Sequence, residues 1–244
     1  MKSDKYQKRF YRDWPGASDL HKAEIIVQET DLYILTDKPI DRDFAAERAR
    51  FYRRQIEAYI QKDRRFLTAL KPIEVELNAA PIVKGMSRAA KKANVGPMAA
   101  VAGAIAEFLG RDLLKKGFKE VIIENGGDIF LKILKTRRVA IYAGKTKLSN
   151  KLYLKIKPQD SPLGICASSA TVGHSLSFGR ADSVVILSRN ALLADAAATA
   201  VCNKTFSKEP LRKAVEFARS IKGVVGTVIV CGNSVLGWGK IEFG

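Results

Sequence analysis

The sequence predicts a single α/β domain of the α+β type, in which helices pack on a largely antiparallel sheet. Short apolar segments separated by turn residues dominate from residue 120 onward, which is typical of antiparallel strands. Segments with apolar residues at three- and four-residue spacing precede and separate them, which indicates amphipathic helices. No repeat or linker interrupts the chain, so residues 1–244 are expected to form one domain.

The first elements are a hairpin and a basic helix. Residues 23–36 alternate apolar and polar positions around residues 29–31, which predicts two short strands. A helix should follow over residues 44–60, because its large apolar side chains fall on one stripe: Phe44, Phe51, Tyr52, Ile56, Tyr59 and Ile60.

Two helices are expected next, and the second is built from small residues. Pro81 opens the first, and Gly96-Pro97 ends it before a helix over residues 98–116. Gly103 would lie in the middle of this second helix, where glycine costs about 1 kcal/mol relative to alanine. We therefore expect a neighbouring backbone or a ligand to come close to Gly103.

Strands and two further helices complete the chain. The predicted helices cover residues 191–201, with Asn190 as the N-terminal cap, and residues 211–221. Turn residues separate the predicted strands, which cover residues 121–123, 129–134, 139–142, 152–156, 183–187, 225–231 and 235–238.

Composition bounds the partners and the compartment. With 42 Lys and Arg against 25 Asp and Glu, the net charge of +17 attracts polyanions, but the basic residues are dispersed, which favours a solvated surface over a nucleic-acid face. Cys166, Cys202 and Cys231 lie far apart in apolar surroundings, so we interpret them as buried thiols. Residues 1–12 lack the apolar core of a signal peptide, and charges interrupt residues 95–114, so a cytoplasmic protein without a membrane span is expected.

Asp195 and Thr199 are the first candidate site. Their four-residue spacing on a predicted helix puts a carboxylate and a hydroxyl on one face, in otherwise apolar surroundings. A buried aspartate needs a cation or several donors, and Mg²⁺ prefers such oxygen ligands. The alternative is an Asp195 that faces solvent or bonds to nearby backbone.

The second candidate is the turn Asn125-Gly126-Gly127-Asp128. Paired glycines let a ligand approach the backbone closely, although Asn-Gly between strands is also the commonest signal of a plain hairpin turn.

The third candidate is the hydroxyl-rich segment 168–179, which could hold phosphate oxygens through side chains such as Ser168, Ser169, Thr171 and Ser175. His174 within it is either a proton shuttle near neutral pH or a structural histidine. Residues 173–177 approach the G-x-S-x-G elbow of a serine hydrolase, but Ser177 replaces its final glycine, which argues against hydrolysis by Ser175 or Ser177.

Four motifs taken in order resemble the uncharacterised branch of the ApbE-like superfamily, which is related to FAD:protein FMN transferases. They cover essentially the whole chain: residues 95–106, 124–129, 168–179 and 194–200. The resemblance implies an ApbE-like sandwich, FAD and Mg²⁺ as cofactors, and FMN transfer to a Ser or Thr of an acceptor protein. It places Asp195 and Thr199 on the family's metal-binding Asp and Thr. It also places Gly126, Gly127 and Asp128 on the turn beside the nucleotide.

The sequence departs from the transferases at two motifs. The Gly-Gly-x-x-Lys-Gly helix start is replaced by residues 99–104 without the lysine, and the His-x-x-x-Pro-x-Thr-Gly segment has no counterpart beyond His174. Binding of a flavin or another phosphorylated ligand with a divalent metal is therefore the leading hypothesis, with or without FMN transfer. The alternative is a non-enzymatic basic module that binds RNA or another polyanion.

Overall fold

The computed structural model describes residues 17–142, 146, 152–169, 181–205 and 211–244. Its centre is an eight-stranded sheet of order β1-β2-β3-β4-β7-β8-β9-β10, in which every neighbouring pair is antiparallel. The strands are β1 (His21–Val27), β2 (Thr30–Thr36), β3 (Val121–Asn125), β4 (Asp128–Lys132), β7 (Leu163–Ser168), β8 (Ser183–Ser188), β9 (Val224–Cys231) and β10 (Ser234–Gly239). The predicted antiparallel sheet is thus confirmed.

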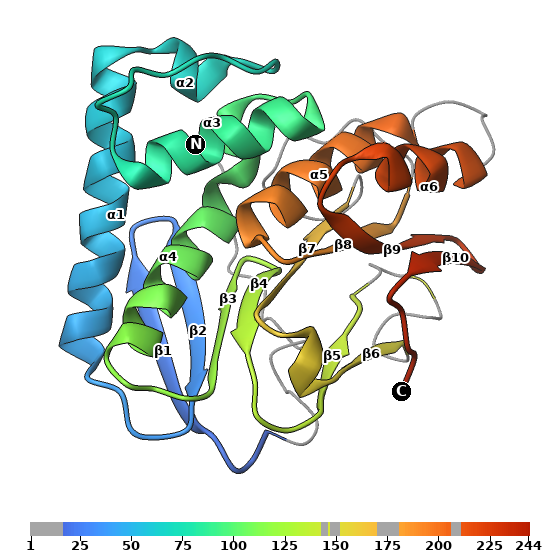
Figure 1. Ribbon diagram of the computed structural model, residues 1–244, viewed down its shortest axis with the longest axis horizontal. Helices are drawn as coiled ribbons and strands as arrows, with labels where there is room; N and C mark the ends of the chain where they lie inside the picture. The colour runs from blue at the N-terminus through green and yellow to red at the C-terminus, as the bar shows by residue number, and fades with distance from the viewer. Residues whose placement is uncertain (1–16, 143–145, 147–151, 170–180, 206–210) are drawn as a thin grey trace.

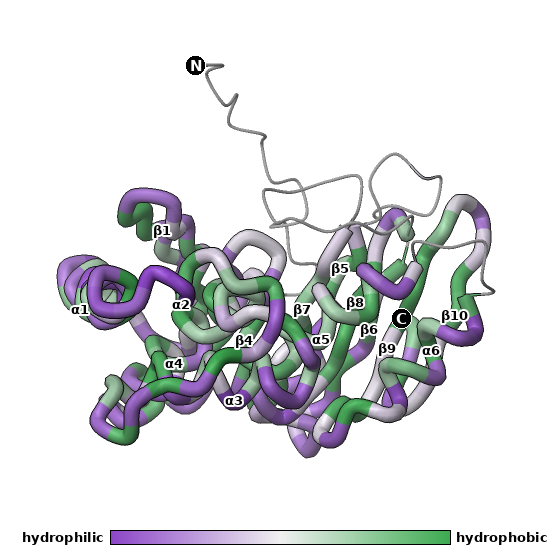
Figure 2. The backbone as a smooth tube through the Cα atoms, turned by 90° about the horizontal axis from the view of Figure 1, so that it is seen from above, coloured by the Kyte–Doolittle hydropathy of each residue, from purple (hydrophilic) through white to green (hydrophobic). Residues whose placement is uncertain are grey.

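The helices pack on one face of this sheet (Figure 1). They are α1 (Arg42–Lys62), α2 (Arg65–Thr68), α3 (Pro81–Ala93), α4 (Val101–Lys115), α5 (Ala191–Lys204) and α6 (Leu211–Ser220), with the 3-10 turns η2 (Pro97–Ala100) and η3 (Pro158–Asp160). Helix α5 lies on β7 and β8 and also contacts α3, α4 and α6, so it is the innermost helix of the layer. Figure 2 shows that α1, at the edge of the layer, is by contrast largely hydrophilic.

A second, smaller core lies on the opposite face of the sheet. The hairpin of β5 (Arg137–Ala140) and β6 (Tyr153–Ile156) covers this face. The C-terminal segment joins it, since the Lys155 amide donates to the Glu242 carbonyl at 2.8 Å and the Gly244 amide to the Tyr153 carbonyl at 3.0 Å. Alternation along β7 and β8 sends side chains to both cores: Cys166 and Ile186 face the helices, and Leu163 and Leu187 face the hairpin.

Several sequence expectations change in detail. The helix expected over residues 98–116 is split, because η2 ends at Ala100 and α4 begins at Val101. Gly103 therefore lies in the first turn of α4 rather than in mid-helix. On α1, Phe51 is 37% exposed and lies against the Arg48 guanidinium instead of in the core, while Tyr52, Ile56 and Tyr59 are buried as predicted. Cys231 is only half-buried, whereas Cys166 and Cys202 are buried.

No single helix in the described residues is long and apolar enough to cross a membrane. Residues 81–93 and 97–115 meet that requirement only when taken together, and a bend of 104° separates them.

Candidate functional site

The β3–β4 hairpin turn has the geometry that its two glycines predict. Asn125 pairs with Asp128, and Gly126 and Gly127 between them have φ values of 66° and 103°, a left-handed backbone that favours glycine. The side chain of Glu124 folds back onto the turn, where its Oε1 accepts from the Gly127 amide at 2.6 Å. A hairpin turn is thus present, and among the described residues a Cβ added to either glycine would meet no atom within 4 Å, so the backbone there is open on that side.

Asp195 is buried, which excludes the solvent-facing alternative. Its side chain lies on α5 and is 9% exposed, and its Oδ2 accepts from the Gly103 amide at 2.9 Å. Burial raises the pKa of Asp195 to about 7, although the backbone amides of Gly103 and Ala102 act in the opposite direction. Asp195 thus bonds to nearby backbone, as one alternative expected. That bond does not offset the full electrostatic cost of burying the carboxylate.

The close approach of α4 to α5 gives Gly103 its packing role. A Cβ at this position would lie 2.4 Å from the Ala191 carbonyl oxygen. Because Gly103 is in the first turn of α4, its amide has no partner within the helix and is available to the carboxylate. One residue earlier in α4, the Ala102 carbonyl accepts from the Asn125 Nδ2 at 3.1 Å, which fixes the glycine turn beside the start of α4.

Asp128 brings a second buried carboxylate to the same place. Burial raises its pKa well above the usual value, and the nearby charge of Asp195 raises it further. Its Oδ1 accepts from the Ala167 amide at 3.3 Å, and the Cys166 thiol is also hydrogen-bonded to it. Cys166 is 0% exposed, lies near both acidic residues and also contacts the Ala191 carbonyl. Burial and both carboxylates raise the pKa of this thiol, which keeps it protonated.

Ser168 supplies an unusual buried hydroxyl. It ends β7 on the strand face that Cys166 shares, it is 4% exposed, and its Oγ has no hydrogen-bond partner in the part of the chain that the structure describes. A buried hydroxyl without a partner is costly in a folded protein unless a ligand or solvent completes it.

For the other predicted site residues that it describes, the structure gives a position in the fold. Thr199 is half-buried one turn after Asp195, on the same side of α5. Ser169, half-buried, follows β7 directly. Thr171, His174 and Ser175 lie outside the described residues, so their roles stay predictions.

Sequence reasoning missed Glu107, which fixes the start of α5. This α4 residue is 2% exposed, and its Oε2 accepts from the Ala191 amide at 2.5 Å while its Oε1 accepts from Arg111. Asn190 caps the same end by accepting from the Leu193 amide at 2.8 Å, as predicted. An acidic residue inside the apolar run 101–110 was the available signal for Glu107. Glu124 and Cys166 were in recognised motifs without an assigned role.

The donor chemistry of the site suits a hard cation. Two buried carboxylates with raised pKa values share one location, and a positive charge there would remove the cost of ionising both. The Thr199 and Ser168 hydroxyls are oxygen donors of the same class. Within the described ranges no cluster of three or more His, Cys, Asp or Glu side chains is arranged to hold a metal, so ligand or water oxygens would complete its coordination.

Comparison with known proteins identifies the family of this chain. The family model described as AbpE bacteria matches residues 15–232. A UPF0280 protein from Methanocaldococcus jannaschii is 41% identical over 225 residues, which cover 90% of this chain and 91% of that protein. A UPF0280 protein from Methanosarcina acetivorans is 38% identical over 221 residues, with coverage of 90% and 87%.

Solved structures with the same fold include a flavin transferase. The flavin transferase ApbE from Vibrio cholerae has a TM-score of 0.61 and 14% identity, and the match covers 90% of this chain and 97% of that one. The ApbE protein from Thermotoga maritima has a TM-score of 0.59 and 13% identity, with coverage of 91% and 96%. At these identities the likeness shows the fold.

Proposed function

This chain belongs to the protein family described as AbpE bacteria. On that basis we propose that it binds FAD together with a divalent cation such as Mg²⁺. We further propose that it transfers FMN from FAD to a serine or threonine of an acceptor protein. The buried carboxylate pair of Asp128 and Asp195 beside the open glycine turn is the observation that carries this proposal. The two carboxylates supply negative charge and oxygen ligands, and the backbone of Gly126 and Gly127 beside them is open to a ligand.

Different residues would bind the cation and the pyrophosphate of FAD. The Asp195 carboxylate and the Thr199 hydroxyl hold the cation, with Asp128 adding negative charge beside them. The glycine turn lets the pyrophosphate come close to the backbone, and Ser168 donates its free hydroxyl to a phosphate oxygen. A bound cation would offset the charge that develops on the pyrophosphate.

The transfer step balances without an external oxidant or reductant. The acceptor hydroxyl oxygen forms a bond to the phosphorus of the FMN half, the pyrophosphate bond breaks, and AMP leaves. The hydroxyl proton passes to a base, for which His174 is the sequence-based candidate.

Thermal unfolding with FAD tests the binding part. FAD with MgCl₂ should raise the midpoint of the wild-type protein more than FAD with a chelator, since a ligand that binds only the folded state stabilises it. Asp195→Asn should abolish the magnesium-dependent part of this shift. Asp43→Asn, the same change at an exposed position of α1, should retain it. A magnesium-independent shift in the wild type would remove the metal from the proposal.

Flavin fluorescence of denatured proteins tests the transfer part. A bacterial lysate incubated with the protein, FAD and MgCl₂ should gain covalently fluorescent bands that Asp195→Asn does not produce. Bound FAD without any labelled band would restrict the function to binding.

A further inference from the structure

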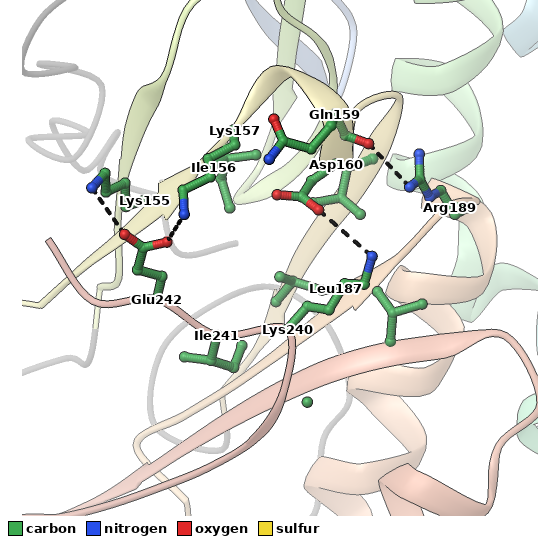
Figure 3. Close-up of a pocket in the computed structure, with 13 residues that line it drawn as sticks. Lys155, Ile156, Lys157, Gln159, Asp160, Leu187, Arg189, Lys240, Ile241 and Glu242 are labelled. Carbon is green, nitrogen blue, oxygen red and sulfur yellow. Dashed lines mark hydrogen bonds and ion pairs between the residues drawn. The ribbon is translucent and has the colours of Figure 1, made fainter.

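A cavity of about 320 Å³ lies on the sheet face opposite α5, between η3, the end of β8 and the C-terminal segment (Figure 3). Leu163 and Leu187, which line it, belong to the core under the β5–β6 hairpin, whereas Asp195 belongs to the helical side of the sheet. The cavity is therefore separate from the proposed flavin site, and an occupant would be a different ligand.

Apolar side chains form part of the cavity wall, alongside the polar and charged ones. Ile156, Leu163 and Leu187 come from three strands, and Ile241 of the C-terminal segment closes the opposite side. Small-molecule sites usually combine such a surface with a few polar groups, and their volumes begin near ~300 Å³. The cavity thus has room for a small organic molecule.

The rim carries more cations than anions. Lys155, Lys157, Arg189 and Lys240 line it against only Asp160 and Glu242. Glu242 accepts from both Lys155 and Lys157, at 2.9 and 2.5 Å, so one carboxylate serves two ammonium groups. Two positive charges at the rim are therefore not balanced by the carboxylates that line it.

Lys240 and Arg189 are the cations best placed for a ligand. The Lys240 ammonium lies 3.6 Å from Asp160, beyond ordinary hydrogen-bond length, so it has donors to offer. Arg189 donates to the carbonyls of Ser161 and Gln159 at 3.3 and 3.2 Å, which orient the guanidinium without neutralising its charge. Figure 3 shows both side chains on the same side of the cavity.

We propose that this cavity binds a small organic anion, with a carboxylate or phosphate head at Lys240 and Arg189 and an apolar body against Leu163, Leu187 and Ile241. The two features that define this ligand class are the excess of cations at the rim and the apolar side chains that form part of the wall. A ligand that lacks either the charge or the apolar body should bind poorly.

Ligand-observed NMR titrations with matched probes test the proposal. We expect 2-naphthoate or 2-naphthyl phosphate to bind at least about tenfold more tightly than neutral 2-naphthylmethanol, and acetate to show no measurable binding. The stronger of the two anions identifies the head group. Equal affinity for 2-naphthoate and 2-naphthylmethanol, or no binding of either anion, would overturn the proposal.

Charge-matched variants locate the site. Lys240→Glu should weaken binding of the tighter anion about tenfold. Lys222→Glu changes the net charge equally at an exposed position outside the cavity and should leave the affinity unchanged. Equal losses in both variants would show attraction by the overall charge and contradict the proposal. Lys240→Gln, a milder change, should weaken binding by about threefold and covers the case in which Lys240→Glu fails to fold.

Asp195→Asn separates this proposal from the flavin proposal. The variant should lose magnesium-dependent stabilisation by FAD and keep full affinity for the naphthyl anion. A matching loss of both would place the anion in the flavin site and refute a second cavity.

Discussion

At Gly103 the backbone of α4 approaches α5 so closely that a side chain has no room. In an ordinary helix position Gly→Ala would stabilise by about 1 kcal/mol, but here the new methyl group would meet a backbone carbonyl 2.4 Å away. We predict that Gly103→Ala destabilises the protein by about 1–3 kcal/mol through overpacking, and that it weakens the contact of α4 with Asp195.

Gly85 provides a matched control in the same helical layer. A Cβ there would lie 2.8 Å from the terminal methyl group of Leu192, and a side-chain end can shift more readily than the backbone carbonyl that faces Gly103. Urea unfolding of Gly85→Ala should show little change or a small gain in the free energy of unfolding. Similar losses at both glycines would contradict the assigned role of Gly103.

Asp195 makes the stability of the metal-free protein depend on pH. Because its folded-state pKa of about 7 lies above the usual ~3.9 of an unfolded chain, the unfolded state releases this proton first as pH rises. The stabilising contribution is complete below pH ~4 and is lost progressively as pH approaches 7.

Urea midpoints of chelated protein at about pH 5 and pH 7.5 test this dependence. The wild type should lose more stability between the two values than Asp195→Asn, which cannot ionise there. Asp128 is present in both proteins, so the difference between them reports on the ionisation of Asp195 and its effect on Asp128. An equal loss in both would show that Asp195 does not have a raised pKa.

Helix α5 depends on an acceptor that lies in another helix. The buried Glu107 carboxylate binds the Ala191 amide at the start of α5, so Glu107→Ala leaves a buried donor unpaired and should cost about 3 kcal/mol. Arg111→Gln removes the half-exposed cation partner but leaves the Ala191 amide bonded to the carboxylate, so it should cost less than Glu107→Ala. Chemical denaturation of both variants measures the difference, and equal costs would contradict the capping role.

At the scale of elements the sequence predicts most of the fold. Apolar periodicity predicted most of the helices and strands, because each must bury a single face, but it did not predict β7 or the short helix α2. It missed the 3-10 turn before α4, since Ala99 and Ala100 carry no signal that distinguishes a 3-10 turn from an α-helix. It also placed Phe51 in the core, although spacing alone does not reveal that the Arg48 guanidinium covers that ring at the surface.

The sequence predicted individual residues of the candidate site but not the hydrogen bonds that join them. Motif spacing identified Asp195 and the glycine turn, but the bonds that join them come from distant segments. Gly103 and Asp195 are separated by 92 positions in sequence. Cys166 was interpreted as a plain buried thiol, because only the fold reveals that it bonds to Asp128.

For the whole molecule, the net charge of +17 predicts weak binding of any polyanion. Filter binding with a generic RNA should show affinity that falls steeply between about 50 mM and 200 mM salt, and Asp195→Asn should not change it. Salt-resistant, sequence-selective binding would instead support the RNA-binding alternative.

Helix α5 is covered by β7 and β8 below and by α3, α4 and α6 around it, and 11 of its 14 residues are buried. Local fraying therefore cannot expose its amides to solvent, and deuterium should enter them only when the entire domain opens. We therefore expect the candidate metal-binding residues to lie on one of the slowest-exchanging helices, so that a ligand would meet side chains already held in place.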